Sequence, residues 1–247
     1  MVSATFDPVR GGRWTSLSAA GREWLWHRPD PARDSVHPGS PFVDAGGVEE
    51  CIPTIRGVPD HGDAWSRPWR ALSPGAARVD AGDFRLARTF TEERGALTAS
   101  YRLDAAPGWR FLWAAHALLD LSEAAVLHAH PGTETRIDGA ADAAWPAPLA
   151  RLGPDDGTAI GAILLDCPTA TVADGESLTF FLEAPGQPAS MALWRNLRGW
   201  PAGSPYRSIG VEPMLGRVWD LASAGPGDAA VVPESGVCEW RLTVTAA

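Results

Sequence analysis

Short stretches of apolar or alternating residues recur along the chain, and Gly, Pro, Asp or Ser closes each of them after a few positions. This rhythm is typical of β-strands joined by turns. A helical period finds little uninterrupted room, because 22 prolines and 26 glycines are spread over the sequence. The pattern therefore predicts an all-β fold with few short helices. The clearest predicted strands cover residues 23–26, 84–90, 97–103, 109–121, 159–165, 178–182, 191–194 and 240–244.

The length of the chain sets its expected organisation. At 247 residues it can bury a large core as one all-β unit, and we predict a single domain over residues 1–247. Apolar residues make up 45% and charged residues 21%, which are the proportions of a folded, soluble protein. Residues 30–41 and 139–148 are rich in Pro, Gly, Ala and Asp, and we predict loops there.

The balance of charges narrows the range of partners. The net charge is -9 and the pI is near 5.1. Proteins that bind nucleic acid usually carry a basic face, so this balance argues against such a partner. All 21 basic residues are arginines, which excludes Schiff-base catalysis and the phosphate loops that depend on lysine. Cys51, Cys167 and Cys238 show no paired spacing, and we predict buried thiols.

Two further features bear on where the protein acts. The first ten residues lack the charged start, apolar stretch and small-residue cleavage site of a secretion signal. The longest apolar runs, such as residues 111–115 and 160–165, are too short to cross a bilayer. We therefore expect a cytoplasmic protein that has no membrane partner.

Three polar residues stand out from strand-like or apolar surroundings. His61 lies in a Pro-Asp-His-Gly turn, His116 lies in a run of large apolar side chains, and Glu212 precedes a proline. Two imidazoles and a carboxylate suffice for proton transfer near neutral pH. Each residue also has a structural interpretation, as a turn residue, a core histidine or a solvated strand end. If the three converge, they define a pocket for acid–base chemistry.

Eight of the twelve tryptophans can be assigned to two groups. Those in strand-like stretches are expected to anchor the core of the sheets. Those beside Gly, Pro, Asp or Arg are expected in loops, where an indole face can stack on the C–H side of a sugar ring, although isolated exposed aromatics are common. The first group contains Trp24, Trp26, Trp113 and Trp240, and the second contains Trp65, Trp69, Trp194 and Trp200.

Five segments in a fixed order carry a resemblance to a known family. They are Gly-Gly-Arg13-Trp-Thr-Ser-Leu with Gly-Arg-Glu-Trp-Leu-Trp, then Gly46-Gly-Val-Glu-Glu50-Cys-Ile-Pro, then Asp60-His61-Gly, then His116, and finally Val-Glu212-Pro. In this order, over most of the chain, the sequence resembles the aldose 1-epimerase (galactose mutarotase-like) superfamily. The resemblance implies a β-supersandwich in which a concave sheet face forms a sugar pocket, and an activity that interconverts the α and β anomers of a sugar.

The resemblance also implies a role for each matching residue. Glu212 would take the proton from the anomeric hydroxyl, His116 would protonate the ring oxygen, and His61 would hydrogen-bond one of these oxygens. A protonated imidazole is expected to keep the neighbouring glutamate ionised, against the effect of burial. No metal or cofactor is expected, because the sugar supplies its own leaving group and nucleophile. The positions at which ring hydroxyls would be recognised are Glu50, Asp63, Trp65 and Arg67.

The sequence departs from the family pattern at recognisable places. The sugar-phosphate branch has an arginine before the Gly-Gly turn and a His-Gly-Phe-Ala-Arg stretch. Here these places hold Ala45 and His-Gly-Asp-Ala-Trp-Ser-Arg67. The free-sugar branch has Asn-Arg and Leu-His-Gly-Gly motifs, whereas Asn196 is the only asparagine of this chain. These departures indicate a substrate that differs from an ordinary hexose.

Two other interpretations stay open at this point. On the same fold, the chain could be a carbohydrate-binding or sensing protein that has lost turnover. Alternatively, His128 and His130 face one side of a strand and Glu134 follows, which is a possible metal-ligand set of a cupin-like barrel. The turn at Pro131-Gly132 and the lack of a second histidine module argue against the metal site. The expected partner is a small-molecule sugar, and the oligomeric state stays open.

Overall fold

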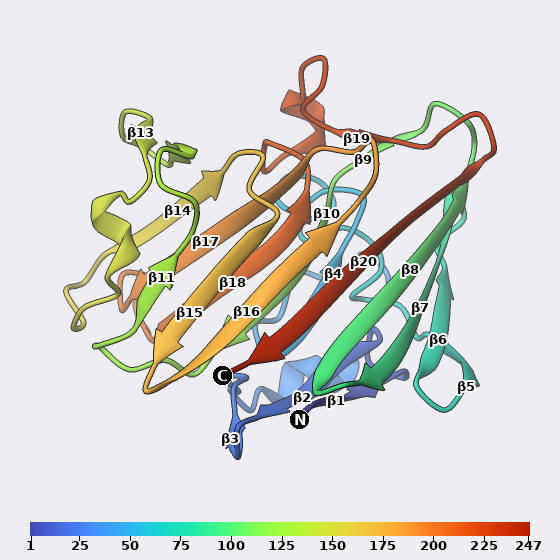
Figure 1. Ribbon diagram of the computed structural model, residues 1–247. Helices are drawn as coiled ribbons and strands as arrows, with labels where there is room; N and C mark the ends of the chain where they lie inside the picture. Colours follow the sequence, from blue (N-terminus) through green and yellow to red (C-terminus); the bar gives the residue numbers. More distant parts are fainter.

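The computed structural model describes residues 1–247, and nearly all of its regular structure is β (Figure 1). One sheet contains β1 (Val2–Asp7), β2 (Arg13–Ala19), β3 (Arg22–Glu23), β4 (Val48–Cys51), β10 (Trp113–Leu119), β12 (Glu134–Ile137), β13 (Ala143–Ala144), β14 (Ala159–Leu164), β17 (Ala189–Leu197) and β18 (Arg207–Leu215). A second sheet contains β5 (Arg70–Ser73), β6 (Ala76–Asp80), β7 (Phe84–Glu93), β8 (Ala96–Ala105), β11 (Val126–His128), β15 (Thr169–Asp174), β16 (Glu176–Glu183) and β20 (Val237–Ala246).

The remaining elements are short. Strands β9 (Arg110–Phe111) and β19 (Ala230–Val231) pair with each other. The helical elements are three 3-10 turns, η1 (Pro31–Ser35), η2 (Pro148–Ala150) and η3 (Leu221–Ser223). The all-β prediction is therefore confirmed. The structure contains no helix whose length and hydropathy would let it cross a bilayer.

Strand order places distant segments side by side. The ten-stranded sheet runs β1-β2-β4-β10-β18-β17-β14-β12-β13 with β3 on β2, and the eight-stranded sheet runs β11-β15-β16-β20-β8-β7-β6-β5. Every ladder between these strands is antiparallel (for example β10 with β18 and β17 with β18). The centre of the larger sheet is thus built from β4, β10, β18 and β17, whose positions in the chain lie up to about 160 residues apart.

Most of the predicted strands occur, with shifted ends. The predicted strand 109–121 is two strands, β9 and β10, separated at Leu112. Strand β18 was not predicted, because Gly210 and Pro213 interrupt its sequence and its residues do not alternate between polar and apolar. All of residues 208–215 are buried, since one face of this strand contacts the core and the other lies beneath a cavity.

The two faces of the ten-stranded sheet have different neighbours. One face packs on the eight-stranded sheet through a core of 51 buried residues, in which Tyr101 stacks on Trp240 at 5.1 Å and Trp113 lies 5.2 Å from Trp240. Trp24, Trp113 and Trp240 are buried as predicted, whereas Trp26 is only half-buried and stacks on Tyr206. The three cysteines are buried free thiols, which confirms that prediction.

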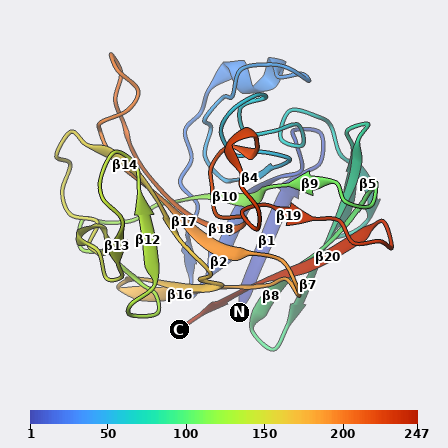
Figure 2. The same ribbon diagram turned by 90° about the horizontal axis from the view of Figure 1, so that it is seen from above.

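The opposite face of the ten-stranded sheet carries a smaller apolar cluster of nine buried residues, among them Ala114, Ala192 and Met214. Because side chains alternate along a strand, these even-numbered neighbours of His116 and Glu212 point away from the main core. Figure 2 shows the segment around residues 28–45 and the hairpin loop around residues 198–206 rising on this side. Together with the sheet, these segments surround a cavity.

Candidate active site

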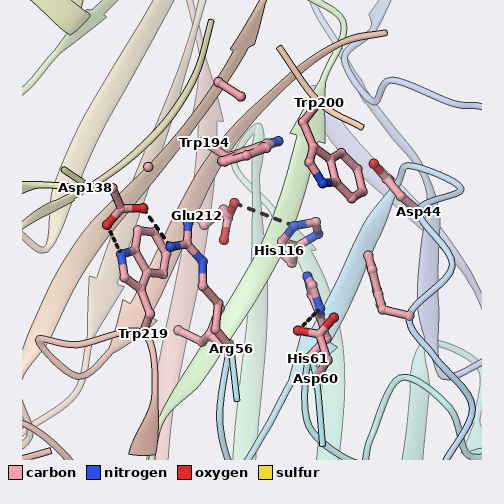
Figure 3. A pocket seen from close by; sticks show the side chains of 14 residues that line it. Asp44, Arg56, Asp60, His61, His116, Asp138, Trp194, Trp200, Glu212 and Trp219 are labelled. Carbon is pink, nitrogen blue, oxygen red and sulfur yellow. Dashed lines mark hydrogen bonds and ion pairs between the residues drawn. The ribbon is translucent and has the colours of Figure 1, made fainter. Parts of the chain in front are cut away.

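A cavity of about 360 Å³ lies on the open face of the ten-stranded sheet (Figure 3). Its walls combine acidic, basic and aromatic side chains. The residues that line it are Phe42, Asp44, Ile55, Arg56, Asp60, His61, His116, Asp138, Ala159, Gly161, Trp194, Trp200, Glu212 and Trp219. The structure thus brings His61, His116 and Glu212 into one cavity, although they come from separate parts of the chain.

Strand register places His116 and Glu212 opposite each other. The pairs Ala114↔Met214 and Leu118↔Gly210 join β10 to β18, and the residues midway between these pairs are His116 and Glu212. Directly opposed residues of an antiparallel pair share one face of the sheet. Nε2 of His116 lies 3.7 Å from Oε1 of Glu212, and both side chains are largely buried. Figure 3 shows the two groups facing each other on the cavity floor.

Two glycines leave the space that the charged side chains of the floor require. A Cβ atom at Gly210 would lie 2.3 Å from Oε1 of Glu212 and 3.1 Å from Cβ of Trp194. A Cβ atom at Gly161 would lie 2.4 Å from Oδ2 of Asp138 and 2.5 Å from Nη2 of Arg56. Neither glycine has a positive φ, so close approach, rather than backbone conformation, requires glycine at these positions.

Burial dominates the electrostatics of the central pair. It raises the pKa of Glu212 although His116 and Arg56 act in the opposite direction. It lowers the pKa of His116 although Glu212 acts in the opposite direction. Both net shifts favour the neutral forms, so burial acts against the ion pair that was expected from the sequence. The neutral pair and the ion pair contain the same number of protons, and moving one proton converts one into the other.

One oxygen of the Glu212 carboxyl group has no hydrogen-bond partner. Oε2 of Glu212 is buried and has no hydrogen-bond partner in the structure. Buried polar atoms of this kind are rare in folded proteins, because the lost hydration is normally replaced by a hydrogen bond. The protein therefore leaves the hydrogen-bonding capacity of Oε2 unused.

A tight turn presents His61 to the cavity. His61 has φ +60°, and Gly62 follows with its Cα so close to Ile52 that a Cβ would lie 2.1 Å from the Ile52 carbonyl oxygen. The imidazole stacks on Phe42 with ring centroids 3.5 Å apart and lies 5.0 Å from the ring of His116. The side chain is therefore held between an aromatic ring and the second imidazole.

Asp60 accompanies His61 in the same turn. Its Oδ1 lies 3.0 Å from Nδ1 of His61, although the contact lacks hydrogen-bond alignment. Burial acts to raise the pKa of Asp60, but the contacts with His61 outweigh it and the net shift is downward. Asp60 is thus a carboxylate at neutral pH, and its charge faces the His61 imidazole.

Arg56, Asp138 and Trp219 form a group that the sequence did not reveal. Nη1 of Arg56 lies 2.6 Å from Oδ2 of Asp138, and Nε1 of Trp219 donates to Oδ1 of Asp138 at 2.9 Å. The Arg56 guanidinium also lies 4.2 Å from the ring centroid of Trp219. No motif connects the three residues along the chain, because the contact between them arises only when distant loops fold over the sheet.

Trp194 and Trp200, both predicted in loops where an indole can stack on a sugar, line the cavity. Trp200 does lie in a loop, whereas Trp194 belongs to strand β17, so the loop prediction is wrong for Trp194. Trp200 is 43% exposed. The buried Asn196 fixes its loop, because the Asn196 side chain accepts hydrogen bonds from the backbone N–H groups of Gly199 and Trp200 and donates one to the Trp200 carbonyl oxygen. The other two, Trp65 and Trp69, are buried and do not line the cavity.

Glu50 corrects one of the sequence predictions. It pairs with Ala115 in the β4–β10 ladder and therefore faces the core, whereas Glu49 pairs with His116. The Glu50 side chain is fully buried. Four donors surround it: Trp14, Arg88 and Tyr101 donate to Oε1, and Trp113 donates to Oε2 at 2.8 Å. No sugar in the cavity can reach this carboxylate.

Asp63, Trp65 and Arg67 also lie outside the cavity lining. Arg67 donates to the Asp63 carboxylate at 3.3 Å, so the two charges pair with each other. Trp65 is 1% exposed, and its indole nitrogen donates to the Asp60 carbonyl oxygen. The turn directs these residues into the protein or along its surface, so the prediction that they recognise ring hydroxyls is corrected.

Glu49 occupies the position beside His116 on the cavity face, yet it does not line the cavity. Arg33 of η1 covers it, donating two hydrogen bonds to Oε1 at 2.9 and 3.1 Å. Burial raises the pKa of Glu49 to about 7 despite this arginine. Of the two carboxyl groups next to His116, those of Glu49 and Glu212, only that of Glu212 can therefore be contacted by a ligand in the cavity.

The alternative metal site is not formed. His128 ends β11 in the eight-stranded sheet, whereas Glu134 begins β12 in the ten-stranded sheet. The Pro131-Gly132 turn carries the chain from one sheet to the other, so Glu134 belongs to a different sheet from His128. No group of three or more His, Cys, Asp or Glu residues in the structure could hold a metal ion, so the cupin-like interpretation is wrong.

The fold and the position of the cavity define the class: the chain has the galactose mutarotase-like β-sandwich fold, with a polar cavity on the open sheet face. No family model matches the sequence, and no curated protein matches it. Solved structures match it along its whole length. A candidate aldose 1-epimerase from Escherichia coli K12 has a TM-score of 0.73 at 12% identity, with 100% of this chain and 99% of that chain covered.

Two further structures are similar. The Slr1438 protein from Synechocystis sp. PCC 6803 has a TM-score of 0.72 at 16% identity, covering 100% of this chain and 96% of that chain. A candidate mutarotase, YeaD, from Salmonella typhimurium has a TM-score of 0.68 at 16% identity, covering 100% and 87%. At these identities the similarity establishes the fold alone.

Proposed function

We propose that the protein is an aldose 1-epimerase-type isomerase that interconverts the α and β anomers of a sugar. The observation that carries this proposal is the pair of His116 and Glu212, opposed on neighbouring strands at the floor of the cavity with their nearest atoms 3.7 Å apart. An acid and a base at this separation can act on two oxygens attached to one carbon atom, which is the geometry of a hemiacetal.

The proposed reaction moves two protons and breaks one bond. Glu212, as carboxylate, takes the proton of the anomeric hydroxyl, while His116, as imidazolium, gives a proton to the ring oxygen as the bond between C1 and that oxygen breaks. The open-chain aldehyde rotates about its C1–C2 bond. The former ring hydroxyl then attacks the other face of C1, and the two proton transfers run in reverse, so that the enzyme returns to its initial state.

The environment of the pair suits this reaction. The ion-pair form and the neutral form contain the same number of protons and interconvert by the transfer of one proton, and burial disfavours the charged form of each group. Glu212 lines the cavity, and its Oε2 has no hydrogen-bond partner within the protein. His61, fixed against Phe42, provides a further hydrogen-bonding group beside His116.

Other residues of the cavity are proposed to hold the sugar. Trp194 and Trp200 supply aromatic faces on which the C–H side of a pyranose can stack. Arg56 and Asp138 supply donors and acceptors for ring hydroxyls on the opposite side. These residues take the place that the sequence had assigned to Glu50, Asp63, Trp65 and Arg67.

The proposal is tested by measuring the rate of anomer exchange in freshly dissolved sugars, by polarimetry or by NMR exchange spectroscopy. Glu212→Gln and His116→Asn should each lower kcat/KM by about 10²–10⁴ while leaving the fold and the sugar affinity largely intact. The matched controls are Glu123→Gln and His128→Asn, which alter exposed residues far from the cavity. Full exchange by either cavity variant would contradict the proposed roles. If the wild-type protein binds a sugar measurably but exchanges its anomers no faster than buffer does, the protein is instead a carbohydrate-binding protein.

A further inference from the structure

A second cavity, of about 390 Å³, adjoins the first on the same side of the ten-stranded sheet. The two cavities share Arg56, Asp138 and Trp219, which therefore border both of them. The second cavity also contains Arg136 of β12 and Arg217, which follows β18. None of the chemistry proposed above uses either arginine.

The charges of the second cavity are balanced. Each guanidinium has a carboxylate nearby: Arg56 lies 2.6 Å from Asp138, Arg136 lies 3.9 Å from Asp228, and Arg217 lies 2.7 Å from Asp166. A site for phosphate or sulfate would need uncompensated positive charge. The lining instead combines the three arginines, as donors, with Asp138 and Asp220, as acceptors, which is the hydrogen-bonding complement of sugar hydroxyls.

The register of the sheet gives the distance between the two sites. Arg136 pairs with Ile163, Ile163 with Ala192, and Ala192 with Glu212. Three strand spacings of about 4.8 Å separate the backbone of Arg136 from that of Glu212, or about 14 Å along one row of the sheet. One pyranose ring is too short to contact both ends of this row, whereas two linked rings can do so.

The surface between the two ends suits a sugar chain. Ile163 provides an apolar floor in the second cavity, and the Trp219 indole borders both cavities. Arg136 is anchored by donating to the Arg217 carbonyl oxygen at 2.9 Å, while 40% of its side chain stays exposed. It is therefore a positioned donor that solvent, or a ligand, can reach.

From this geometry we propose that the second cavity is a subsite for the second sugar unit of a reducing disaccharide or of the reducing end of a longer glycan. This inference rests on the proposed function, because the first unit occupies the cavity of His116 and Glu212. Arg136 is the specificity-determining residue of the subsite. It contacts the second unit and leaves the binding of a monosaccharide unchanged.

Binding measurements with two sets of probes test the subsite. Isothermal titration of the full chain compares glucose, galactose and mannose with maltose, lactose and cellobiose. At least one disaccharide should bind about tenfold more tightly than its own reducing-end monosaccharide, as expected for one added hydrogen bond to a charged group. Arg136→Ala should abolish this difference and leave the monosaccharide affinity within about twofold of the wild type.

Two further variants separate a specific contact from a general disturbance. Ser223→Trp fills the second cavity from an exposed position on its wall and should also abolish the preference for the disaccharide. Arg102→Ala, which removes an exposed arginine of the eight-stranded sheet, should leave the preference unchanged. Thermal melts confirm that each variant is folded before its affinity is compared.

The outcomes distinguish the two proposals. Monosaccharide binding and anomer exchange without any gain from a disaccharide would overturn the subsite and leave the proposed function standing. If the tighter binding of the disaccharide persists in both Arg136→Ala and Ser223→Trp, the subsite proposal is also overturned, because the second sugar unit would then lie elsewhere. If no sugar in the panel binds, both proposals fail.

Discussion

Replacing Glu50 with glutamine separates a sugar-binding role from a role in the core. The Glu50 carboxylate is fully buried and accepts hydrogen bonds from Trp14, Arg88, Tyr101 and Trp113. All four partners are donors. An amide group has one oxygen to accept them, and its NH2 group would meet a donor wherever it points.

The magnitude follows from these contacts. The substitution leaves the Arg88 guanidinium, which is 1% exposed, without its counter-charge. Removing one partner of a buried ion pair typically costs about 3–5 kcal/mol, out of a total stability of about 5–15 kcal/mol for a domain. For a chain of this length we expect Glu50→Gln to lower Tm by roughly 6–20 °C.

Urea denaturation followed by tryptophan fluorescence measures the loss, with Glu123→Gln as a matched exposed control. At a temperature at which the variant is still folded, its affinity for the sugar should equal that of the wild type. A variant that is within about 1 kcal/mol of the wild type would refute the structural role. A stable variant that no longer binds sugar would restore the interpretation of Glu50 as a ligand-binding residue.

Two further predictions concern the cavity floor. Because burial raises the folded-state pKa of Glu212 above its ordinary value of 4.5, the contribution of this group to stability is present below pH 4.5 and is lost as pH rises through the folded-state pKa. The free energy of unfolding of Glu212→Gln should therefore rise relative to that of the wild type as pH increases above 4.5, and a difference that stays constant with pH would contradict the shift. Gly210→Ala places a methyl group 2.3 Å from the present position of Oε1 of Glu212, so it should lower the rate of anomer exchange by about 10–100-fold with little loss of stability, as expected when a reacting group is misplaced. An unchanged rate would mean that the position of Oε1 is not critical.

The difference between Glu49 and Glu50 illustrates the limit of sequence patterns. Two adjacent glutamates in a strand must face opposite sides, so one of them had to point into a layer of the protein. Which one does so depends on the pairing of β4 with β10, and a shift of one residue would exchange them. The buried partners Arg33 and Arg88 come from outside this strand, and nothing near the glutamates in the sequence reveals them.

The same limit applies to the cavity walls. His61, His116 and Glu212 carried local signals, namely a polar group in an apolar run or beside Gly and Pro. Arg56, Asp138 and Trp219 carried none, because their contacts join a loop after β4 to loops after β12 and β18. Their proximity depends on the strand order of the ten-stranded sheet.

The sequence by itself determined the all-β class, the approximate extent of many strands, the burial of the thiols and the set of residues with acid–base potential. These properties follow from local propensity, turn residues and side-chain chemistry, which act over a few neighbouring positions. Only the tertiary structure decided which carboxylates are buried with arginines, and which tryptophans and which ion pair line the cavity. Those outcomes depend on register and on contacts between distant strands, and a single sequence does not encode them in any local pattern.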